Sequence, residues 1–155
     1  MTPVILLCGV AGAGKTTYSR RLEAEGYLRV SYDEEMWTLG GNSTDVTPDM
    51  LAEADRRVRD HIRASLASGQ PVVLDASLST RVIRDDLREF VHRAGGVPRL
   101  VLVDAPFGLL AARVSRRLNH ADPNAHYLDE ASLRGYHAAF EFPGEDEPHT
   151  RVVTA

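Results

Sequence analysis

The sequence predicts an α/β fold, a three-layer α/β/α sandwich whose central parallel sheet has about five strands. Apolar runs of strand length alternate with helical patterns along the chain, which is the order found in parallel sheets with helical crossovers. The apolar runs are also continuous, as expected for strands buried on both faces. Because the chain has 155 residues, we expect a single domain over residues 1–155.

The first half of the chain is expected to contain three strands and two helices. In order, these are a strand at 4–8, a helix at 15–25, a strand at 27–32, a helix at 47–69 and a strand at 71–75. Thr47 and Pro48 mark the start of the long helix, since Thr caps helices and Pro is favoured at the first position. Apolar residues from Leu51 to Leu66 recur at helical spacing and predict one buried face. The arginines at positions 56 to 63 fall off this face and are interpreted as solvated.

The second half is expected to add three helices and two strands. In order, these are a helix at 80–94, a strand at 99–103, helices at 108–119 and 129–140, and a strand at 151–154. In the first of these helices, four apolar residues are expected to point inward: Ile83, Leu87, Phe90 and Val91.

Polar or flexible residues follow several of the expected strands. They are Gly9, Asp33, Asp75 and Asp104. Ligands of parallel sheets bind outside the carboxyl ends of the strands. We therefore expect the functional site at this edge.

Composition narrows the class of protein further. The chain is 43% hydrophobic and 26% charged, which argues against a disordered tail or a membrane protein. Its formal net charge of −4 disfavours binding to duplex nucleic acid, which requires a basic face. The single cysteine, Cys8, lies in an apolar run and predicts a buried, inert thiol. The apolar N-terminal stretch is too short for a signal or membrane helix, so we expect a cytoplasmic protein.

A phosphate-binding motif joins the first strand to the first helix. Residues 9–16 read Gly-Val-Ala-Gly-Ala-Gly-Lys-Thr, which fits the pattern G-x-x-x-x-G-K-[ST] in full, in the required strand-to-helix context. Glycine permits tight turns, and successive N–H groups then form an anion nest at the helix N-terminus. Lys15 can reach the β- and γ-phosphates, and the Thr16 hydroxyl can bind Mg²⁺. We expect ATP to contact Gly9, Ala11, Gly12, Ala13, Gly14, Lys15, Thr16 and Thr17.

Lys15 is the only lysine of the chain, which has 18 Lys and Arg residues in total. A single lysine inside this motif excludes the guanine-reading Asn-Lys-x-Asp motif of ordinary small GTPases. The chain is also too short for the extra domains of motor ATPases. Both observations favour a kinase. A compact ammonium suits a tight phosphate loop better than a guanidinium does.

The chain resembles a group of small P-loop kinases, the AAA-like ATP-binding domains that include the polynucleotide kinase domain, zeta toxins and chloramphenicol phosphotransferase. The resemblance covers most of the chain, and its most specific part is the motif at 9–16. The other matching segments are Asp33, Val72–Ser77, Arg113–Arg117 and Phe140–Pro143. The resemblance implies a P-loop NTPase fold with a helical lid, and Mg²⁺ and ATP as cofactors.

The resemblance also implies roles for two carboxylates. In such kinases an Asp after the second strand acts as base toward the acceptor hydroxyl, and Asp33 matches it. The alternative is an acidic helix start, which neighbours Glu34 and Glu35 fit better. Asp75 matches the carboxylate that supports Mg²⁺ or its waters, and the alternative is a cap for the following helix.

Two arginines match a lid that closes over ATP in this group. Arg113 and Arg117 are four residues apart at the start of a segment, about 113–128, that is expected to form the lid. Guanidinium groups suit the charge of a phosphoryl group in transfer. The alternative is a solvated helix face, and Arg116 could take the place of Arg117.

Two departures from the group, and one partial similarity to another, bear on the acceptor. A basic residue that commonly follows the catalytic Asp by three positions is replaced by Met36, with Trp37 after it, which suggests a less charged acceptor. Leu78 stands where Asn is frequent. The acidic tail after Phe140 is similar to that of gluconate kinases. However, the Asp-Gly-Asp signature of sugar-acid kinases is absent, and Ser-Tyr-Asp occupies 31–33, so that group is disfavoured.

Together these observations predict an ATP-dependent kinase that phosphorylates a hydroxyl of a small molecule. Within enzymes, the alternative is a polynucleotide or nucleotide 5′-hydroxyl kinase, which would need a basic acceptor groove. From another class, the alternative is an ATP-binding regulatory module without catalysis. We expect no membrane partner, and a monomer or a homodimer.

Overall fold

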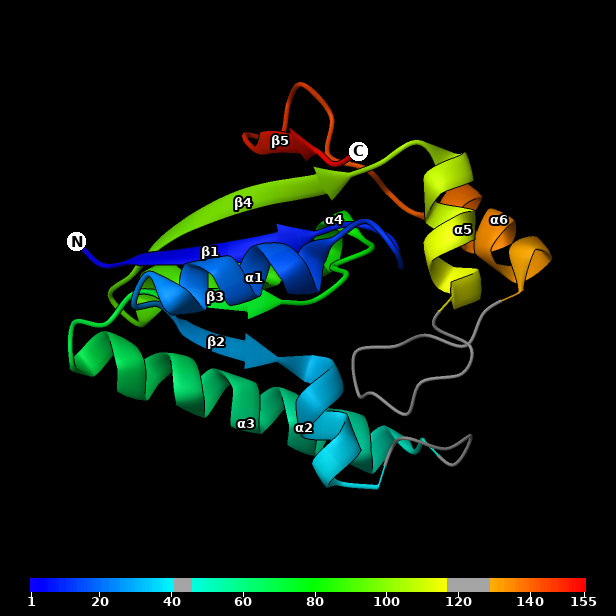
Figure 1. Ribbon diagram of the computed structural model, residues 1–155. Coiled ribbons are helices and arrows are strands. Elements are labelled where there is room, and N and C mark those ends of the chain that lie inside the picture. The colour runs from blue at the N-terminus through cyan, green and yellow to red at the C-terminus, as the bar shows by residue number, and fades with distance from the viewer. Residues whose placement is uncertain (41–45, 117–128) are drawn as a thin grey trace.

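The fold is a five-stranded parallel sheet with helices on both faces. The computed structural model describes residues 1–40, 46–116 and 129–155. Figure 1 shows the sheet with strand order β2-β3-β1-β4-β5, and every pair of neighbouring strands is parallel. The strands are β1 (Pro3–Cys8), β2 (Leu28–Ser31), β3 (Val72–Asp75), β4 (Val97–Asp104) and β5 (Thr150–Val153).

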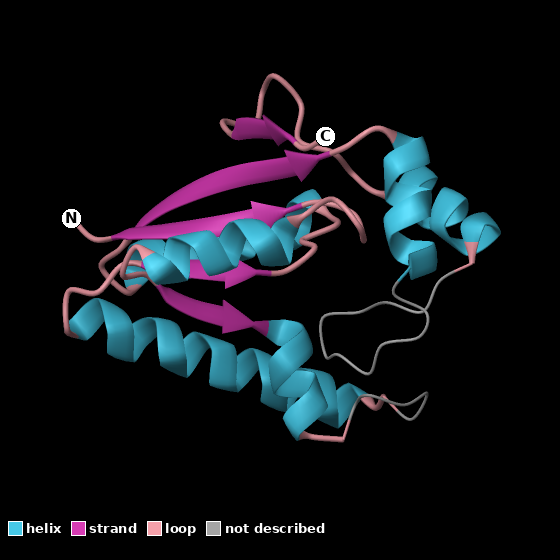
Figure 2. Ribbon diagram, viewed as in Figure 1, coloured by secondary structure: helices cyan, strands magenta, loops and turns pink. Residues whose placement is uncertain are grey.

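The helices connect successive strands. They are α1 (Lys15–Ala24), α2 (Tyr32–Thr38), α3 (Pro48–Ala67), α4 (Arg81–Arg93), α5 (Phe107–Arg116) and α6 (Glu130–Ala139). α1 and α4 lie on opposite faces of the sheet, while α5 and α6 stand beyond its carboxyl edge (Figures 1 and 2). The predicted three-layer sandwich is therefore confirmed.

Most elements begin where the sequence predicts. Thr47 caps α3, since its Oγ1 accepts a hydrogen bond from the Met50 N–H at 3.1 Å, and Pro48 is the first helical residue. The central strands are buried on both faces, as continuous apolar runs require. Leu6 and Leu74, on neighbouring strands β1 and β3, have no exposed surface.

The sequence predicts the short helix α2 only as the alternative role of the acidic cluster, a helix start. Ser31 caps it by accepting a hydrogen bond from the Glu34 N–H at 3.2 Å. Asp33 thus lies in the first turn of a helix, where the partial positive charge of the N-terminus favours carboxylates. The acidic cluster at 33–35 is a helix start, and this is compatible with a catalytic Asp33.

Two residues that the sequence places in the core are exposed. Periodicity assigns the side chains of Leu51 on α3 and Ile83 on α4 to buried faces, but Leu51 is 54% and Ile83 is 46% exposed. Helical periodicity identifies the correct faces, yet both residues lie near the start of their helices, where about half of each side chain stays exposed. The prediction that these two side chains are buried is therefore wrong.

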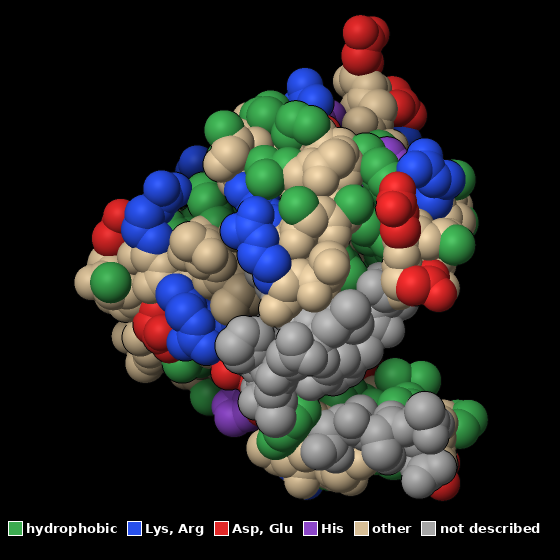
Figure 3. All heavy atoms as spheres, turned by 45° about the vertical axis from the view of Figure 1, so that its right-hand side comes forward, with side chains coloured by type: hydrophobic (Ala, Val, Ile, Leu, Met, Phe, Trp, Pro, Cys, Tyr) green, Lys and Arg blue, Asp and Glu red, His purple; other side chains and the backbone are tan. Residues whose placement is uncertain are grey.

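The surface mixes charges of both signs. On the face shown in Figure 3, Lys and Arg side chains are interspersed with Asp and Glu side chains. The described part of this face has no continuous basic strip of the kind that tracks a nucleic-acid backbone. None of the described helices is both long and apolar enough to cross a membrane.

Candidate active site

The motif at 9–16 forms a tight loop between β1 and α1. Gly12 and Gly14 have φ angles of 84° and 105°, which glycine adopts without strain. Lys15 is buried, and its Nζ donates to the carbonyl oxygens of Gly9 at 2.8 Å and Val10 at 3.0 Å. The ammonium therefore lies inside the curve of the loop, as a phosphate ligand requires.

The glycines also permit close packing around this loop. A Cβ atom placed on Gly9 would lie 2.4 Å from the carbonyl oxygen of Val103, on the neighbouring strand β4. A Cβ on Gly12 would lie 3.1 Å from the carbonyl oxygen of Leu110, on α5. Two of the motif's glycines are thus required by contacts with the backbone.

A cavity of about 480 Å³ opens beside Asp33, between α2, α3, α4 and the loop that follows β3. We call it the acceptor cavity. Its apolar lining is Met36, Leu51, Ala54, Ala76, Leu78, Ile83 and Leu87. Its polar lining is Tyr32, Asp33, Asp55, Arg59, Ser77, Ser79 and Asp86. The exposed Leu51 and Ile83 therefore present apolar surface to a cavity.

A chain of hydrogen bonds fixes the polar side of the acceptor cavity. The Tyr32 hydroxyl donates to Asp55 at 2.6 Å, and Arg59 bridges Asp55 at 2.9 Å and Asp86 at 2.7 Å. Burial, together with the hydrogen bond to Asp55, raises the pKa of Tyr32, so the phenol stays protonated as a donor. Arg59 is thus not the solvated surface residue that the sequence predicts.

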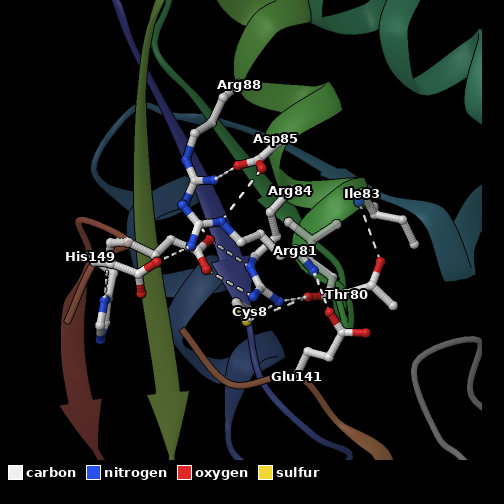
Figure 4. A network of polar contacts seen from close by, with 12 residues as sticks. Cys8, Thr80, Arg81, Ile83, Arg84, Asp85, Arg88, Glu141 and His149 are labelled. Atoms are coloured by element: carbon white, nitrogen blue, oxygen red, sulfur yellow. Dashed lines mark hydrogen bonds and ion pairs between the residues drawn. The ribbon is translucent and has the colours of Figure 1, made fainter. Parts of the chain in front are cut away.

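The loop at 76–79 belongs to both the acceptor cavity and the surroundings of the phosphate loop. The Gly9 N–H donates to the Ser77 carbonyl at 3.0 Å. Leu78 has a φ of 49°, a conformation rare outside glycine. Its carbonyl accepts from Arg84 at 2.7 Å, and Cys8 Sγ lies 3.6 Å from the same oxygen (Figure 4).

Burial raises the pKa of Cys8 to about 11. The thiol therefore stays protonated near neutral pH. This agrees with the predicted inert cysteine.

Asp75, at the end of β3, is buried in a polar cluster. Its Oδ2 accepts from Arg29 at 2.7 Å and from the Ser19 hydroxyl at 3.1 Å. Ser19 Oγ also lies 3.0 Å from the backbone oxygen of Thr16. The cluster ties the first turn of α1 to strands β2 and β3. No local sequence pattern marks Arg29 or Ser19 as members of this site.

Arg113 lies against the phosphate loop. Its Nη1 donates to the Gly12 carbonyl at 2.9 Å and to Thr154 Oγ1 at 2.9 Å. Thr154 Oγ1 in turn lies 2.8 Å from the Ala13 carbonyl. These contacts join the start of the expected lid to the end of β5. Arg117 and most of the expected lid lie outside the described residues.

A second cavity of about 460 Å³ lies next to this junction. It is lined by Gly14, Thr17, Tyr18, Arg21, Arg113, Val152, Val153 and Thr154. The Arg21 guanidinium lies over the Tyr18 ring at 4.8 Å from its centre. Its lining includes Gly14 and Thr17, which belong to the expected ATP contacts.

Comparison with known proteins places the chain among kinases. Residues 4–143 match the family described as an AAA domain. The chain is 28% identical over 159 residues to a gluconokinase of Gluconobacter oxydans (strain 621H), covering 96% of this chain and 80% of the relative.

Two solved structures have folds similar to that of this chain. A gluconokinase from Sinorhizobium meliloti 1021 superposes with a TM-score of 0.66 and 26% identity, covering 99% of this chain and 83% of that chain. A chain of the Pnkp1/Rnl/Hen1 RNA repair complex has a TM-score of 0.77 and 18% identity, covering 89% of this chain but only 43% of that chain. The chain is similar to gluconokinases although Ser-Tyr-Asp, and not Asp-Gly-Asp, occupies residues 31–33. The prediction that disfavours gluconate kinases is therefore not supported by these comparisons.

Proposed function

The chain belongs to the AAA domain family and is a kinase of the P-loop type with a hydroxyl group as acceptor, and we propose that its acceptor is a small molecule. ATP is the phosphoryl donor in this proposal. The acceptor cavity of about 480 Å³ has the size of small-molecule sites.

The loop at 76–79 is the observation that carries the proposal. It lines the acceptor cavity through Ser77 and Leu78, and it accepts a hydrogen bond from Gly9 at the start of the phosphate loop. The two substrates therefore meet across one loop. Phosphoryl transfer needs this juxtaposition above all, since positioning and electrostatics supply most of the catalysis.

Each residue of the phosphate loop and the cavity then has a role. Backbone N–H groups of the phosphate loop after Gly9, whose own N–H donates to Ser77, hold the phosphates. Lys15 neutralises the charge that develops on the transferring group. Asp33, at the cavity wall, accepts the proton of the acceptor hydroxyl. The second cavity, next to Thr17 and Arg113, holds the nucleobase.

Mg²⁺ suits the oxygen ligands at this edge. The Thr16 hydroxyl follows Lys15 at the start of α1, and the Asp75 carboxylate, whose Oδ2 accepts from Ser19 and Arg29, would support a metal-bound water. The described residues contain no group of three or more His, Cys, Asp or Glu side chains that could hold a metal ion. The phosphates would therefore complete the coordination, and Mg²⁺ would neutralise their charge.

Two observations weigh against a polynucleotide 5′-hydroxyl kinase. Met36 replaces the basic residue that would hold an acceptor phosphate, and the described lining of the acceptor cavity includes one cation, Arg59, which is already paired with two carboxylates. A purely regulatory module would not need Asp33 in a cavity beside the phosphate loop.

Acceptor-dependent release of ADP tests the proposal. Pooled metabolites, nucleosides and 5′-hydroxyl oligonucleotides are screened with the wild-type protein, and the positive pools are repeated with Asp33→Asn. We expect the variant to bind ATP normally but to lose turnover by about 100-fold or more. Glu35→Gln, on the same helix, is the control and should retain activity. Full transfer by Asp33→Asn would show that Asp33 is not the base.

A further inference from the structure

The acceptor cavity carries an excess of negative charge. Three of its side chains are carboxylates, Asp33, Asp55 and Asp86, and Arg59 is the one cation in its described lining. Without counting Asp33, the two carboxylates Asp55 and Asp86 together with Arg59 amount to a formal charge of −1. An anionic acceptor would be repelled by this lining, while an uncharged or cationic one would not.

The positive charge of Arg59 is already engaged by two carboxylates of the acceptor cavity. Its Nε donates to Asp55 at 2.9 Å and its Nη2 to Asp86 at 2.7 Å. The guanidinium also lies over the Phe90 ring, 4.8 Å from its centre. A substrate carboxylate at Arg59 would therefore have to approach two carboxylates that already contact the guanidinium.

Half of the residues that line the acceptor cavity are apolar. Leu51 and Ile83 are about half exposed there, and Met36, Leu78 and Leu87 continue the apolar lining. Large exposed apolar side chains gathered in one cavity indicate a ligand that covers them. A sugar acid has many hydroxyls and no apolar face, so it would leave this surface in contact with water.

From charge and lining together, we propose that the acceptor is an alcohol with an apolar face and no negative charge, either uncharged or amine-bearing. This inference rests on the proposed kinase function and narrows its substrate class. It separates this chain from the gluconokinases it is similar to, because the acceptor that their name specifies is a sugar acid.

Alcohols that share a skeleton but differ in charge test the inference. One series is gluconate, glucitol and 1-amino-1-deoxyglucitol, and the other is phenylalaninol with its N-acetyl and N-succinyl derivatives. ADP release gives kcat/KM, and calorimetry with a non-hydrolysable ATP analogue gives binding. Within each series we expect the uncharged and amine forms to exceed the anion by about tenfold or more. We also expect the phenyl series to exceed the glucitol series.

A charge-altering pair of variants tests the cavity itself. Ile83→Lys places a cation in the acceptor cavity, whereas Val82→Lys places one on the neighbouring residue, which is 78% exposed and does not line the cavity. We expect Ile83→Lys to shift the ratio of anion to amine binding by about fivefold or more toward the anion. Val82→Lys should leave that ratio at the wild-type value.

The outcomes separate the two proposals. Preference for gluconate or the N-succinyl derivative, or failure of every compound to bind, would overturn the inference on substrate class. If ADP is released and an anionic acceptor is preferred, the inference on substrate class is overturned but the proposed kinase function stands. Binding of amines with no ADP release from any acceptor would instead contradict the proposed function alone.

Discussion

Arg84 and Glu147, which are 63 residues apart in the sequence, form a buried ion pair with two parallel hydrogen bonds. Arg84 Nε donates to Glu147 Oε2 at 2.8 Å, and Nη2 donates to Oε1 at 2.9 Å. Their side chains are 1% and 2% exposed. Because Arg84 also binds the carbonyl of Leu78, the pair supports the loop that the acceptor cavity shares with the phosphate loop (Figure 4).

We expect Glu147→Ala to lower the free energy of unfolding by about 3–5 kcal/mol, because it leaves Arg84 buried without its carboxylate partner. Urea unfolding of the variant and of the wild type at neutral pH measures this difference. Glu145→Ala, at an exposed position of the same segment, is the control and should change the value by less than about 0.5 kcal/mol. A loss below about 1 kcal/mol for Glu147→Ala would contradict a supporting role.

The same pair makes stability depend on pH. Hydrogen bonds from Arg84 outweigh the effect of burial and lower the pKa of Glu147 from 4.5 to about 2. Since the folded pKa lies below the unfolded one, the contribution of Glu147 is fully present above about pH 4.5 and is lost as the pH falls toward 2. This contribution of Glu147 to the free energy of unfolding amounts to about 3 kcal/mol.

Unfolding curves of the wild type and of Glu147→Gln at pH 7, 5, 4 and 3 measure this loss. We expect the difference in unfolding free energy between the two chains to narrow as the pH falls below about 4.5. The pKa of the exposed Glu53 is also lowered, by hydrogen bonds from Arg56 and Arg57. Because Glu53 is present in both chains, its contribution cancels in the difference between them. A constant difference across this range would show that Glu147 keeps an ordinary pKa.

We expect Lys15→Arg to lower turnover by about 100-fold or more, although it keeps the positive charge. Lys15 Nζ lies within 3.0 Å of two carbonyl oxygens inside the loop, and a planar guanidinium does not fit this space. Initial rates with a positive acceptor, together with ATP binding, measure the effect. Arg20→Lys, on the exposed side of α1, should retain full activity. Wild-type turnover of Lys15→Arg would show that the reaction does not require the ammonium group of Lys15.

We expect Gly9→Ala to reduce both stability and ATP affinity. The added Cβ would lie 2.4 Å from the Val103 carbonyl oxygen, so β1, β4 or the loop must shift. Thermal unfolding with and without ATP measures both effects. Gly108→Ala is the matched control, because a Cβ there meets nothing within 4 Å and the residue is helical. That control should be neutral or stabilising by up to about 1 kcal/mol. Equal stability and equal ATP affinity of the two variants would contradict a role for the close approach of Gly9 to Val103.

Local sequence patterns predict the parts of the site that need no knowledge of distant contacts. The phosphate loop follows from the spacing of its glycines, Lys15 and Thr16, and Asp33 follows from its place after a strand. The five strands follow in their correct order along the chain from the apolar runs, because continuous burial leaves a mark on each segment by itself.

Pairs between distant segments could not be predicted. Arg29 with Asp75, Arg59 with Asp86 and Arg84 with Glu147 join different elements, and 17 of the 18 basic residues are arginines with no local mark that separates a buried one from a solvated one. The exposure of Leu51 and Ile83 depends on where neighbouring helices end, which periodicity does not encode. The acceptor cavity therefore emerges only from the three-dimensional arrangement.

Arg113 provides a test that separates two roles. The resemblance to small kinases assigns it to the stabilisation of the transferring phosphoryl group, which predicts that Arg113→Met turns over much more slowly even when ATP is saturating. Its contacts with the Gly12 carbonyl and with Thr154 instead predict that the variant has a looser phosphate loop and a looser second cavity.

From these contacts we expect Arg113→Met to raise KM for ATP by about tenfold and to lower kcat by less than about threefold. Thr154→Val, which removes the hydroxyl between Arg113 and the Ala13 carbonyl, should reproduce the direction of the KM change. Arg93→Met, at an exposed position of α4, is the control and should match the wild type. If turnover at saturating ATP instead dropped by about 100-fold or more, Arg113 would be assigned to the transition state, because an interaction made only there lowers kcat and kcat/KM equally.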